Sequence, residues 1–478
     1  MKSIAFGGVF LLFLLVSSIS FATDHPAPGE SPALAGVEIT QADIESGALS
    51  LLEIRKIGRI IFSAPFNQYD GYGDGPWDPS ESPTEFGGRP TLQGNGMLLR
   101  VNGLDSQSCL ECHFALSASD VPMKFGVGGF GGVGASAMFQ PTVIDPTGSV
   151  GGGIAAFDGR FINPPFVFGA GGVELLGKEM TRDLQSLKQT AVDNPGVEVE
   201  LVTKGVSFGF LSFVDGAFVF DKVEGIDDDL VVRPFGRKGS FATTRGFDVG
   251  AFEFHMGIQP VEAFGAGTDA DNDGVVDEIT VGEISAVAIF NTTLERPRMT
   301  RRSRTAKQGY GLFKAVGCAE CHIPALKTES RYLPFSFPEV DTEPFENVFY
   351  EVDLTKKPTG FQKTRSGGIR VPLFADLKRH YMGEELAESF GSDLDPFFTT
   401  ARLWGVADTA PYMHDGRALT IREAILQHAG EAEASRDAFA ALSDEDQSKV
   451  LEFLQTLRTP KSVGDDLDRE YRRRRDDD

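Results

Sequence analysis

Length, composition and charge already limit what this protein can be. The chain has 478 residues, of which 41 % are hydrophobic and 24 % are charged, and 45 Lys and Arg face 69 Asp and Glu for a net charge of −24. This length corresponds to about two to four domains and excludes a mini-protein, while the composition excludes collagen and coiled coil. The acidic excess argues against a nucleic-acid partner, because phosphate contacts need clustered cations.

The N-terminus, residues 1–22, resembles a secretory signal peptide. Lys2 supplies the positive end, residues 9–16 are apolar, and residues 20–22 end in a small residue suited to cleavage. We therefore expect export to the periplasm and no membrane association after cleavage. The alternative is a retained anchor over residues 4–21, which is a borderline length for a membrane span.

The cysteines carry the strongest signal in the sequence. All four belong to two Cys-x-x-Cys-His motifs, which consist of Cys109, Cys112 and His113, and of Cys318, Cys321 and His322. Two thiols at this spacing can each bond a haem vinyl group, and the histidine that follows binds the iron. A zinc site would need the two motifs to converge, and a thioredoxin-like pair would not need the histidine. The motifs predict two covalently bound c-type haem groups, with His113 and His322 as iron ligands.

A long insertion separates the two motifs. Residues 125–134 are rich in glycine, and their Gly-x-Gly-x-x-Gly spacing follows no strand, so they indicate a loop rather than a dinucleotide site. Several β-like runs between residues 197 and 232 alternate with turn residues such as Asp215-Gly216, which predicts an antiparallel meander. We expect an N-terminal haem domain over residues 23–295 that contains this Gly-rich and antiparallel β insertion.

The second motif has the flanking helices of a cytochrome c domain. Residues 305–316 have helical spacing and lead into the motif, and Ser443 with Asp446 marks the start of a C-terminal helix. We expect a C-terminal cytochrome c domain over residues 296–463, followed by a charged, disordered tail over residues 464–478. The predicted fold class is mainly α, with two cytochrome c-like haem domains.

One further histidine stands on a predicted helix. Thr420 and Glu423 form a capping box, and His428 shares a face with the apolar residues of the helix that follows. This position could bring His428 to a haem as a sixth ligand. The alternative is a core histidine hydrogen-bonded to a carbonyl.

An acidic loop resembles the start of an EF-hand, with oxygen-bearing residues at alternate positions and Gly274 at the sixth. The twelfth position is Thr280 instead of Glu, so the site would have to be shortened. A calcium ion would be bound by Asp269, Asp271, Asp273, Asp277 and Glu278. The alternative is a solvated acidic loop without an ion.

Beyond these motifs, the chain resembles the di-haem oxidoreductases described as peroxidases or thiol oxidoreductases. They are distant relatives of bacterial di-haem cytochrome c peroxidase and of the methylamine dehydrogenase maturation enzyme. The similar stretches are residues 163–181, 254–262, 269–284, 317–324, 373–383 and 402–437. Because every cysteine belongs to a haem motif, the term thiol oxidoreductase cannot describe chemistry by this chain's own cysteines.

The resemblance implies roles for individual residues. Residues 410–416 are similar to a peroxidase segment after which the C-terminal haem receives its sixth ligand, and His428 stands at that position. The segment that ends in Glu262 resembles the one that supplies a distal glutamate, which implies that Glu262 moves the peroxide proton. His255 would either close the N-terminal haem or lie in an open distal pocket. His380 and His414 receive no firm role.

The leading hypothesis is an exported peroxidase-type oxidoreductase. Hydrogen peroxide would be reduced at the N-terminal haem, with electrons passing through the C-terminal haem from a small donor protein of the cytochrome c or cupredoxin type. One alternative is a di-haem oxidase that modifies a protein or peptide substrate. Another is an electron-transfer cytochrome with two closed haems.

Overall fold

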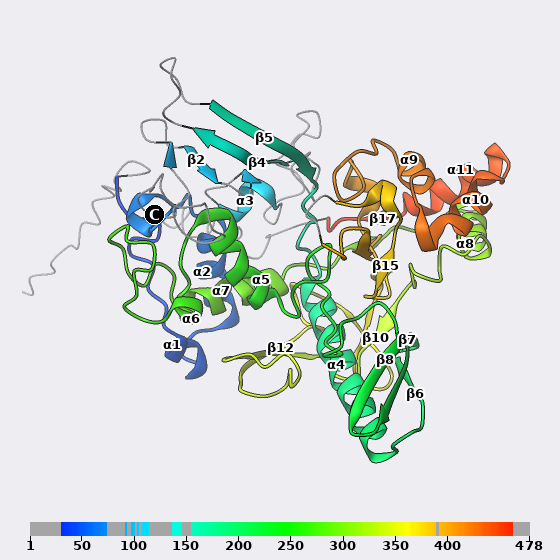
Figure 1. The fold of residues 1–478 in the computed structure, drawn as a ribbon, viewed down its shortest axis with the longest axis horizontal. Coiled ribbons are helices and arrows are strands. Elements are labelled where there is room, and N and C mark those ends of the chain that lie inside the picture. The colour runs from blue at the N-terminus through cyan, green and yellow to red at the C-terminus, as the bar shows by residue number, and fades with distance from the viewer. Residues whose placement is uncertain are drawn as a thin grey trace, which may run out of the picture.

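The computed structural model describes residues 30–73, 91–92, 97–100, 103–104, 108–113, 136–145, 154–388 and 392–461 (Figure 1). These residues form helices and small antiparallel sheets, so the expected class of mainly α is too narrow. Most of the strands pair over only a few residues, which leaves too short an alternation to be recognised in sequence. The predicted signal peptide, the Gly-rich loop and the charged tail lie outside the described residues. No described helix has the length and apolarity needed to cross a membrane.

A group of helices forms the N-terminal part of the core. Helix α2 (Leu51–Ser63) packs against α7 (Val281–Thr292), which is buried on nearly every side and also contacts α5 (Thr244–Ala251). The close approach requires Gly58, because a Cβ there would lie 2.2 Å from the carbonyl oxygen of Ala286. The other helices of this part are α1 (Gln41–Glu45), α3 (Cys109–Cys112), the π-helical turn η4 (Phe252–Met256) and α6 (Val261–Phe264).

A long helix and a three-stranded meander form the second part of the fold (Figure 1). Helix α4 (Ala170–Asp193) packs on the antiparallel sheet of β6 (Val199–Thr203), β7 (Val206–Val214) and β8 (Ala217–Val223). The predicted meander and its turn are confirmed, since Asp215 and Gly216 have φ of 50° and 83° between β7 and β8. The run at residues 230–232 is no strand, because the left-handed φ of 59° at Leu230 interrupts the extended backbone.

Antiparallel pairs of short strands and single helical turns complete the described chain. The strand groups are β1 (Thr91–Leu92), β2 (Met97–Arg100) and β3 (Gly103–Leu104); β4 (Ser136–Asp145) with β5 (Ile154–Ile162); β9 (Arg298–Met299) with β17 (Leu457–Arg458); β10 (Leu326–Lys327), β14 (Ile369–Val371) and β13 (Gln362–Lys363); β11 (Tyr332–Ser336) with β12 (Val348–Asp353); and β15 (Arg379–Tyr381) with β16 (Phe397–Thr399). The helical turns are η1 (Gln68–Asp70), η5 (Glu384–Leu386), η6 (Val406–Asp408) and η7 (Gly430–Ala432).

The C-terminal helices form a second hydrophobic cluster around Phe313 and Phe453, whose ring centroids are 5.3 Å apart. The helix predicted before the second motif is confirmed as α8 (Arg304–Ala315), and the one predicted after Ser443 as α11 (Asp444–Leu454). The remaining helices here are α9 (Ile421–Leu426) and α10 (Glu433–Ala440). Buried residues between positions 326 and 377 join the larger N-terminal cluster, and the predicted domain boundaries stay predictions.

The packing of α8 on α11 can be tested at a glycine. A Cβ at Gly309 would lie 1.8 Å from the carbonyl oxygen of Lys449, so Gly309→Ala must push the helices apart. We expect the free energy of unfolding to fall by about 1–3 kcal/mol in denaturant titrations. Gly311→Ala is the matched control, because nothing lies within 4 Å of that position, and it should gain about 0.5–1 kcal/mol. Equal stability of the two variants would contradict the observed packing.

Candidate functional site

The two Cys-x-x-Cys-His motifs share one local geometry. The backbone N–H of His113 donates to the Cys109 carbonyl at 2.8 Å, and that of His322 donates to the Cys318 carbonyl at 3.0 Å. Each motif therefore forms one helical turn, which places residues i, i+3 and i+4 on the same side. The first motif forms α3, and the second follows the end of α8. Cys109, Cys318 and Cys321 take part in no disulfide, and the side chain of Cys112 lies outside the described atoms.

Each motif histidine is fixed by a main-chain carbonyl. Nδ1 of His113 donates to the carbonyl of Pro165 at 2.7 Å, and Nδ1 of His322 donates to that of Phe374 at 3.1 Å. With Nδ1 protonated and bonded, Nε2 keeps its lone pair for a metal, as in most histidine-metal sites. Desolvation lowers the pKa of His113, and desolvation together with the neighbouring His428 lowers the pKa of His322 to about 4. Both rings are therefore neutral, as iron ligands must be.

The structure brings His428 to the second motif. Its ring centroid lies 6.3 Å from that of His322, with 64° between the ring planes. This separation would leave room for one metal between the two rings, with bonds of about 2 Å to each. The helix is shorter than expected, however: α9 ends at Leu426, so His428 lies beyond it and not on its apolar face. Nδ1 of His428 donates to the Ala424 carbonyl at 2.8 Å, and burial lowers the pKa of the ring.

His380 has carboxylate partners that sequence reasoning missed. Nε2 lies 2.8 Å from Asp376 and Nδ1 lies 2.7 Å from Glu431. Burial favours the neutral ring, but hydrogen bonds to Asp376, Cys321 and Glu431 raise the pKa of His380 to about 11. The protein thus keeps a paired cation beside the second motif. The spacing of Asp376 and His380 could have suggested the first contact, but no local pattern marks Glu431, 51 residues away.

A single asparagine connects the surroundings of the two motifs. The side-chain amide of Asn163 donates to the carbonyls of Pro411 at 2.7 Å and Met413 at 3.1 Å. The backbone N–H of Asn163 donates to the His414 carbonyl at 2.8 Å. Asn163 lies two residues before Pro165, whose carbonyl holds His113. The loop at the first motif is therefore fixed to the turn that precedes α9. The His414 ring itself packs on Phe398, with centroids 4.5 Å apart.

Helix α5 links Glu262 to the first motif. Arg245 donates from Nε to Glu262 at 3.0 Å, and its Nη1 donates to Ser285 at 2.6 Å. Phe247, two residues further along α5, has its ring centroid 6.4 Å from that of His113. The ring of His255 stands edge-on to Phe254 within η4, with centroids 4.9 Å apart. The catalytic roles of Glu262 and His255 stay predictions.

The acidic loop gathers three of its carboxylates. Ligand oxygens of Asp269, Asp271 and Asp273 all lie within 4.8 Å of one another. Burial, and then the charge of Asp273, raise the pKa of Asp271 to about 7. Asp277 turns away from this group, because its carboxylate accepts the backbone N–H of Gly267 at 2.7 Å. The loop therefore offers three convergent carboxylates from the predicted set of five.

Glu278 is a buried acidic residue whose pKa responds to the three aspartates. The residue is 8 % exposed, and its Oε1 is buried without a hydrogen-bond partner among the described residues. Its other oxygen accepts the backbone N–H of Gln259 at 2.7 Å. Burial, with the charges of the three aspartates, raises the pKa of Glu278 to about 9. A cation bound by the three aspartates would also stabilise the buried carboxylate of Glu278, because their charges act on it.

Comparisons with known proteins give a family model that matches part of the chain, and distant solved structures that include the following two. No curated protein matches the chain. Hydrazine synthase of Kuenenia stuttgartiensis, solved under 20 bar xenon, is 13 % identical with a TM-score of 0.30, over 96 % of this chain and 98 % of that one. A MauG-like protein associated with microbial copper homeostasis is 16 % identical with a TM-score of 0.25, over 46 % of this chain and 68 % of that one. Similarity at these TM-scores establishes neither fold nor function.

The family match falls on the second site. Residues 365–457 match the family described as "Di-haem oxidoreductase, putative peroxidase". This range includes Phe374, which holds His322, together with His380 and His428. Haem fits the residues present, because both motifs carry a neutral histidine with Nδ1 bonded to a carbonyl and Nε2 left to bind iron. The resemblance found in the sequence is confirmed for residues 365–457, which match the di-haem oxidoreductase family.

Proposed function

We propose that this protein is an exported c-type di-haem oxidoreductase that reduces hydrogen peroxide in the periplasm. The observation that carries the proposal is the pair of His322 and His428, whose centroids lie 6.3 Å apart with both Nδ1 atoms bonded to carbonyls. Such a pair suits a closed iron site, which transfers electrons rather than binding a substrate. Peroxide would then be reduced at the N-terminal haem, which His113 binds.

The motif geometry supports covalent attachment of both haems. Cys109 with Cys112, and Cys318 with Cys321, stand three residues apart within one turn, and the histidine that ends each turn lies on the same side. We assign His113, His322 and His428 as iron ligands. When bound, haem supplies an iron that exchanges single electrons and that can bind peroxide where a coordination position is open.

The protein's own contribution at the first site is proton transfer by Glu262. A carboxylate beside bound peroxide can take a proton from one oxygen and deliver it to the leaving oxygen. Arg245 holds Glu262 through a charge-assisted bond at 3.0 Å, and the guanidinium is fixed in turn by Ser285. The pair is mostly buried, with exposed side-chain fractions of 6 % and 12 %, which keeps bulk water from competing for the proton.

Electrons would come from a small donor protein of the cytochrome c or cupredoxin type. Each peroxide consumes two electrons and two protons and yields two waters. The Asn163 hydrogen bonds keep the loop that holds His113 against the turn leading to His428. A fixed distance between the sites favours electron passage, because the path need not re-form in each turnover.

We also propose that the acidic loop binds calcium through Asp269, Asp271, Asp273 and Glu278. Calcium prefers six to eight oxygen ligands, including carboxylates and main-chain carbonyls. The loop also positions Glu262: Glu278 accepts the N–H of Gln259, and the N–H of Val261 donates to the Ile279 carbonyl at 3.0 Å. The ion would thereby hold the segment that leads into the proton-transferring residue.

Steady-state peroxide assays with a reduced small cytochrome c as donor test the main proposal. The purified di-haem protein should consume two donor molecules per peroxide. Glu262→Gln should lower kcat by about 10²–10⁴-fold, because the amide cannot exchange a proton, while the absorption spectra of both haems stay unchanged. Glu351→Gln, at an exposed position, is the control. No peroxide turnover by the wild-type protein with several such donors, and no spectral response to peroxide, would refute peroxidase function.

Replacing the predicted sixth ligand should open the second haem. His428→Ala is expected to convert one of the two haems from low spin to high spin and to let cyanide bind there, as absorption and electron paramagnetic resonance spectra would show. His428→Met should remain low spin but have a higher reduction potential. His414→Ala, which removes a ring packed on Phe398, is the control and should keep the wild-type spin state. An unchanged spectrum in His428→Ala would exclude His428 as a ligand.

Calcium should stabilise the protein and support its activity. Adding Ca²⁺ at about 100 times its dissociation constant should raise the free energy of unfolding by about 2.7 kcal/mol over the chelator-treated protein. Mg²⁺ should do less, because it demands a strict octahedral site and retains its waters. Asp271→Asn should weaken the calcium-dependent rise in Tm, while Asp221→Asn, in the exposed strand β8, should not. A Tm unaffected by Ca²⁺ in the wild-type protein would refute the site.

A further inference from the structure

We propose that a buried network of charged side chains conducts protons from a pocket on α4 to Glu262 at the N-terminal haem site. The acid network, as we call it, comprises Glu339, Lys178, Glu174, Asp248, Arg245 and Glu262. It deepens the proposed function and rests on it, since peroxide reduction consumes protons at a site shielded from water.

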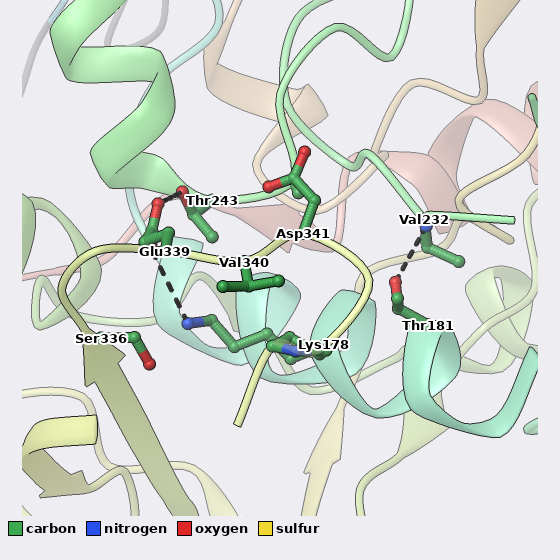
Figure 2. Close-up of a pocket in the computed structure, with 10 residues that line it drawn as sticks. Lys178, Thr181, Val232, Thr243, Ser336, Glu339, Val340 and Asp341 are labelled. Carbon is green, nitrogen blue, oxygen red and sulfur yellow. Dashed lines mark hydrogen bonds and ion pairs between the residues drawn. The ribbon is translucent and has the colours of Figure 1, made fainter. Parts of the chain in front are cut away.

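The pocket marks the outer end of the network (Figure 2). Glu339 lies at its wall and accepts a hydrogen bond from the Thr243 hydroxyl at 2.6 Å, while Nζ of Lys178 lies 3.9 Å from the same carboxylate. The Glu339 side chain retains 18 % exposure, which connects it to solvent. Ser336 also lines the pocket, and its Oγ is buried without a partner among the described residues. Such an atom is a normal binding place for ordered water.

The second step lies along α4. Lys178 bridges Glu339 and Glu174, with its Nζ 3.4 Å from the Glu174 carboxylate, and both side chains are only 3 % exposed. The other oxygen of Glu174 accepts the backbone N–H of Thr244 at 2.9 Å, at the start of α5. Glu174 therefore carries the network from the pocket helix to the helix that packs beside His113.

The third step follows one face of α5. Thr244 and Asp248 are four residues apart and so lie on the same side of the helix. The Thr244 hydroxyl is buried without a partner among the described residues, and Asp248 is 6 % exposed. Burial raises the pKa of Asp248 well above its usual range, and the charges of Glu174, Arg245 and Glu262 also act on it. The Asn291 side-chain amide donates to both oxygens of Asp248, at 3.0 Å and 3.2 Å, and so fixes the carboxyl group between Glu174 and Glu262 in the proposed order of the network.

The inner end of the network is Glu262 on α6, which accepts a hydrogen bond from Arg245 on α5. Arg245 also lies over the Phe337 ring, 4.7 Å from its centroid, so the loop that carries Glu339 packs against the inner end as well. Phe247, which directly precedes Asp248 on α5, contacts the His113 ring. The network therefore ends at the residue to which the proposed function assigns proton transfer.

The charge balance of the network favours proton exchange over a purely structural role. It contains four carboxyl groups and two cations, all largely removed from water. The carboxyl groups outnumber the cations by two, and burial raises the pKa of Asp248 well above its usual range, so this group favours its protonated form. Burial raises the pKa of Glu339 to about 7, so this outer group exchanges protons with water near neutral pH. Clusters of this kind are candidates for proton transfer.

The stoichiometry defines what the network must deliver. One H₂O₂ accepts two electrons and two protons, its O–O bond breaks, and two waters leave. The electrons come from the external donor, and the protons enter at Glu339 and pass through Glu174 and Asp248 to Glu262. Each carboxyl group releases a proton inward and regains one from the outer side, so the network itself ends unchanged.

Proton uptake measured without peroxide tests the network directly. Reduction of the di-haem protein in weakly buffered solution with a pH indicator, followed by stopped flow, should show proton uptake by the wild-type protein. Glu339→Gln should slow this uptake at least tenfold while leaving haem spectra and Tm close to wild type. Glu346→Gln, an exposed carboxylate in the same loop, should behave as wild type.

The pH dependence gives a second readout. Proton uptake by the wild-type protein should slow as the pH rises through about 7, because protonated Glu339 is the outer donor. The uptake rate of Glu339→Gln should not change in this pH range. Infrared difference spectra between the oxidised and reduced protein, recorded in H₂O and D₂O, should contain one carboxyl band in the wild-type protein that is missing in Glu339→Gln. The charged and titratable groups that face Glu339 are Lys178 and Glu174 on α4, Arg245 on α5, and Asp341 in its own loop.

A milder pair of variants guards against misfolding of Glu339→Gln. Thr243→Ser keeps the hydroxyl that donates to Glu339 and should retain wild-type uptake, whereas Thr243→Val removes it and should slow uptake. Wild-type uptake rates in both Glu339→Gln and Thr243→Val at every pH would overturn the network. Absence of peroxide turnover by the wild-type protein would instead overturn the proposed function, and the uptake comparison would still decide the network.

Discussion

The structure depends above all on hydrogen bonds from histidine Nδ1 to main-chain carbonyls. His113, His322 and His428 each make one, to Pro165, Phe374 and Ala424 respectively. These bonds fix the tautomer and the direction of Nε2 before any metal is present. The carbonyls at the two motif histidines belong to loops, so the surrounding fold must hold those loops rigidly. Much of the packing around both sites serves this purpose.

The backbone of Phe374, whose carbonyl holds His322, is strained. It is left-handed, with φ of 55°, which is unfavourable by about 1–3 kcal/mol for a residue of this kind. The side chain is 1 % exposed and packs against Phe313 and Phe453, with centroid distances of 6.4 Å and 5.9 Å. Burial of one phenyl ring offsets a strain of this size. The C-terminal hydrophobic cluster therefore aims the carbonyl that orients His322.

Helix α4 carries two buried acid groups of different character. Glu179 is 1 % exposed, accepts the backbone N–H groups of Glu329 and Ser330 at 2.8 Å and 2.9 Å, and lies 3.0 Å from Nζ of Lys204. These contacts satisfy its charge, as a structural carboxylate requires. The acid network, which begins five residues earlier at Glu174, has more carboxylates than cations, and the neighbouring Oγ of Ser336 and hydroxyl of Thr244 have no partner among the described residues. The contrast within one helix supports a structural role for the first group and a functional role for the second.

Sequence reasoning succeeded where spacing within a few residues determines the structure. The Cys-x-x-Cys-His turns, the capped helices before and after the second motif, and the turn at Asp215 all depend on neighbours along the chain. It failed where partners are distant, as for Glu431 with His380, or where the partner is a carbonyl that any residue could supply, as at Pro165 and Phe374. It also placed His428 on a helix that ends at Leu426, because the periodicity of apolar residues continues past the last helical turn.

The position of Glu262 illustrates why distant partners matter for function. From one side, the acidic loop fixes the preceding segment through Glu278 and Ile279. From the other, Arg245 binds the carboxylate, and the same helix packs Phe247 on His113. Neither support is visible in the short segment around Glu262, yet both must be in place for a carboxylate to reach a reacting oxygen within hydrogen-bond distance. The proton transfer proposed for Glu262 would therefore depend on how α5 and the acidic loop pack, and less on the short segment that contains Glu262.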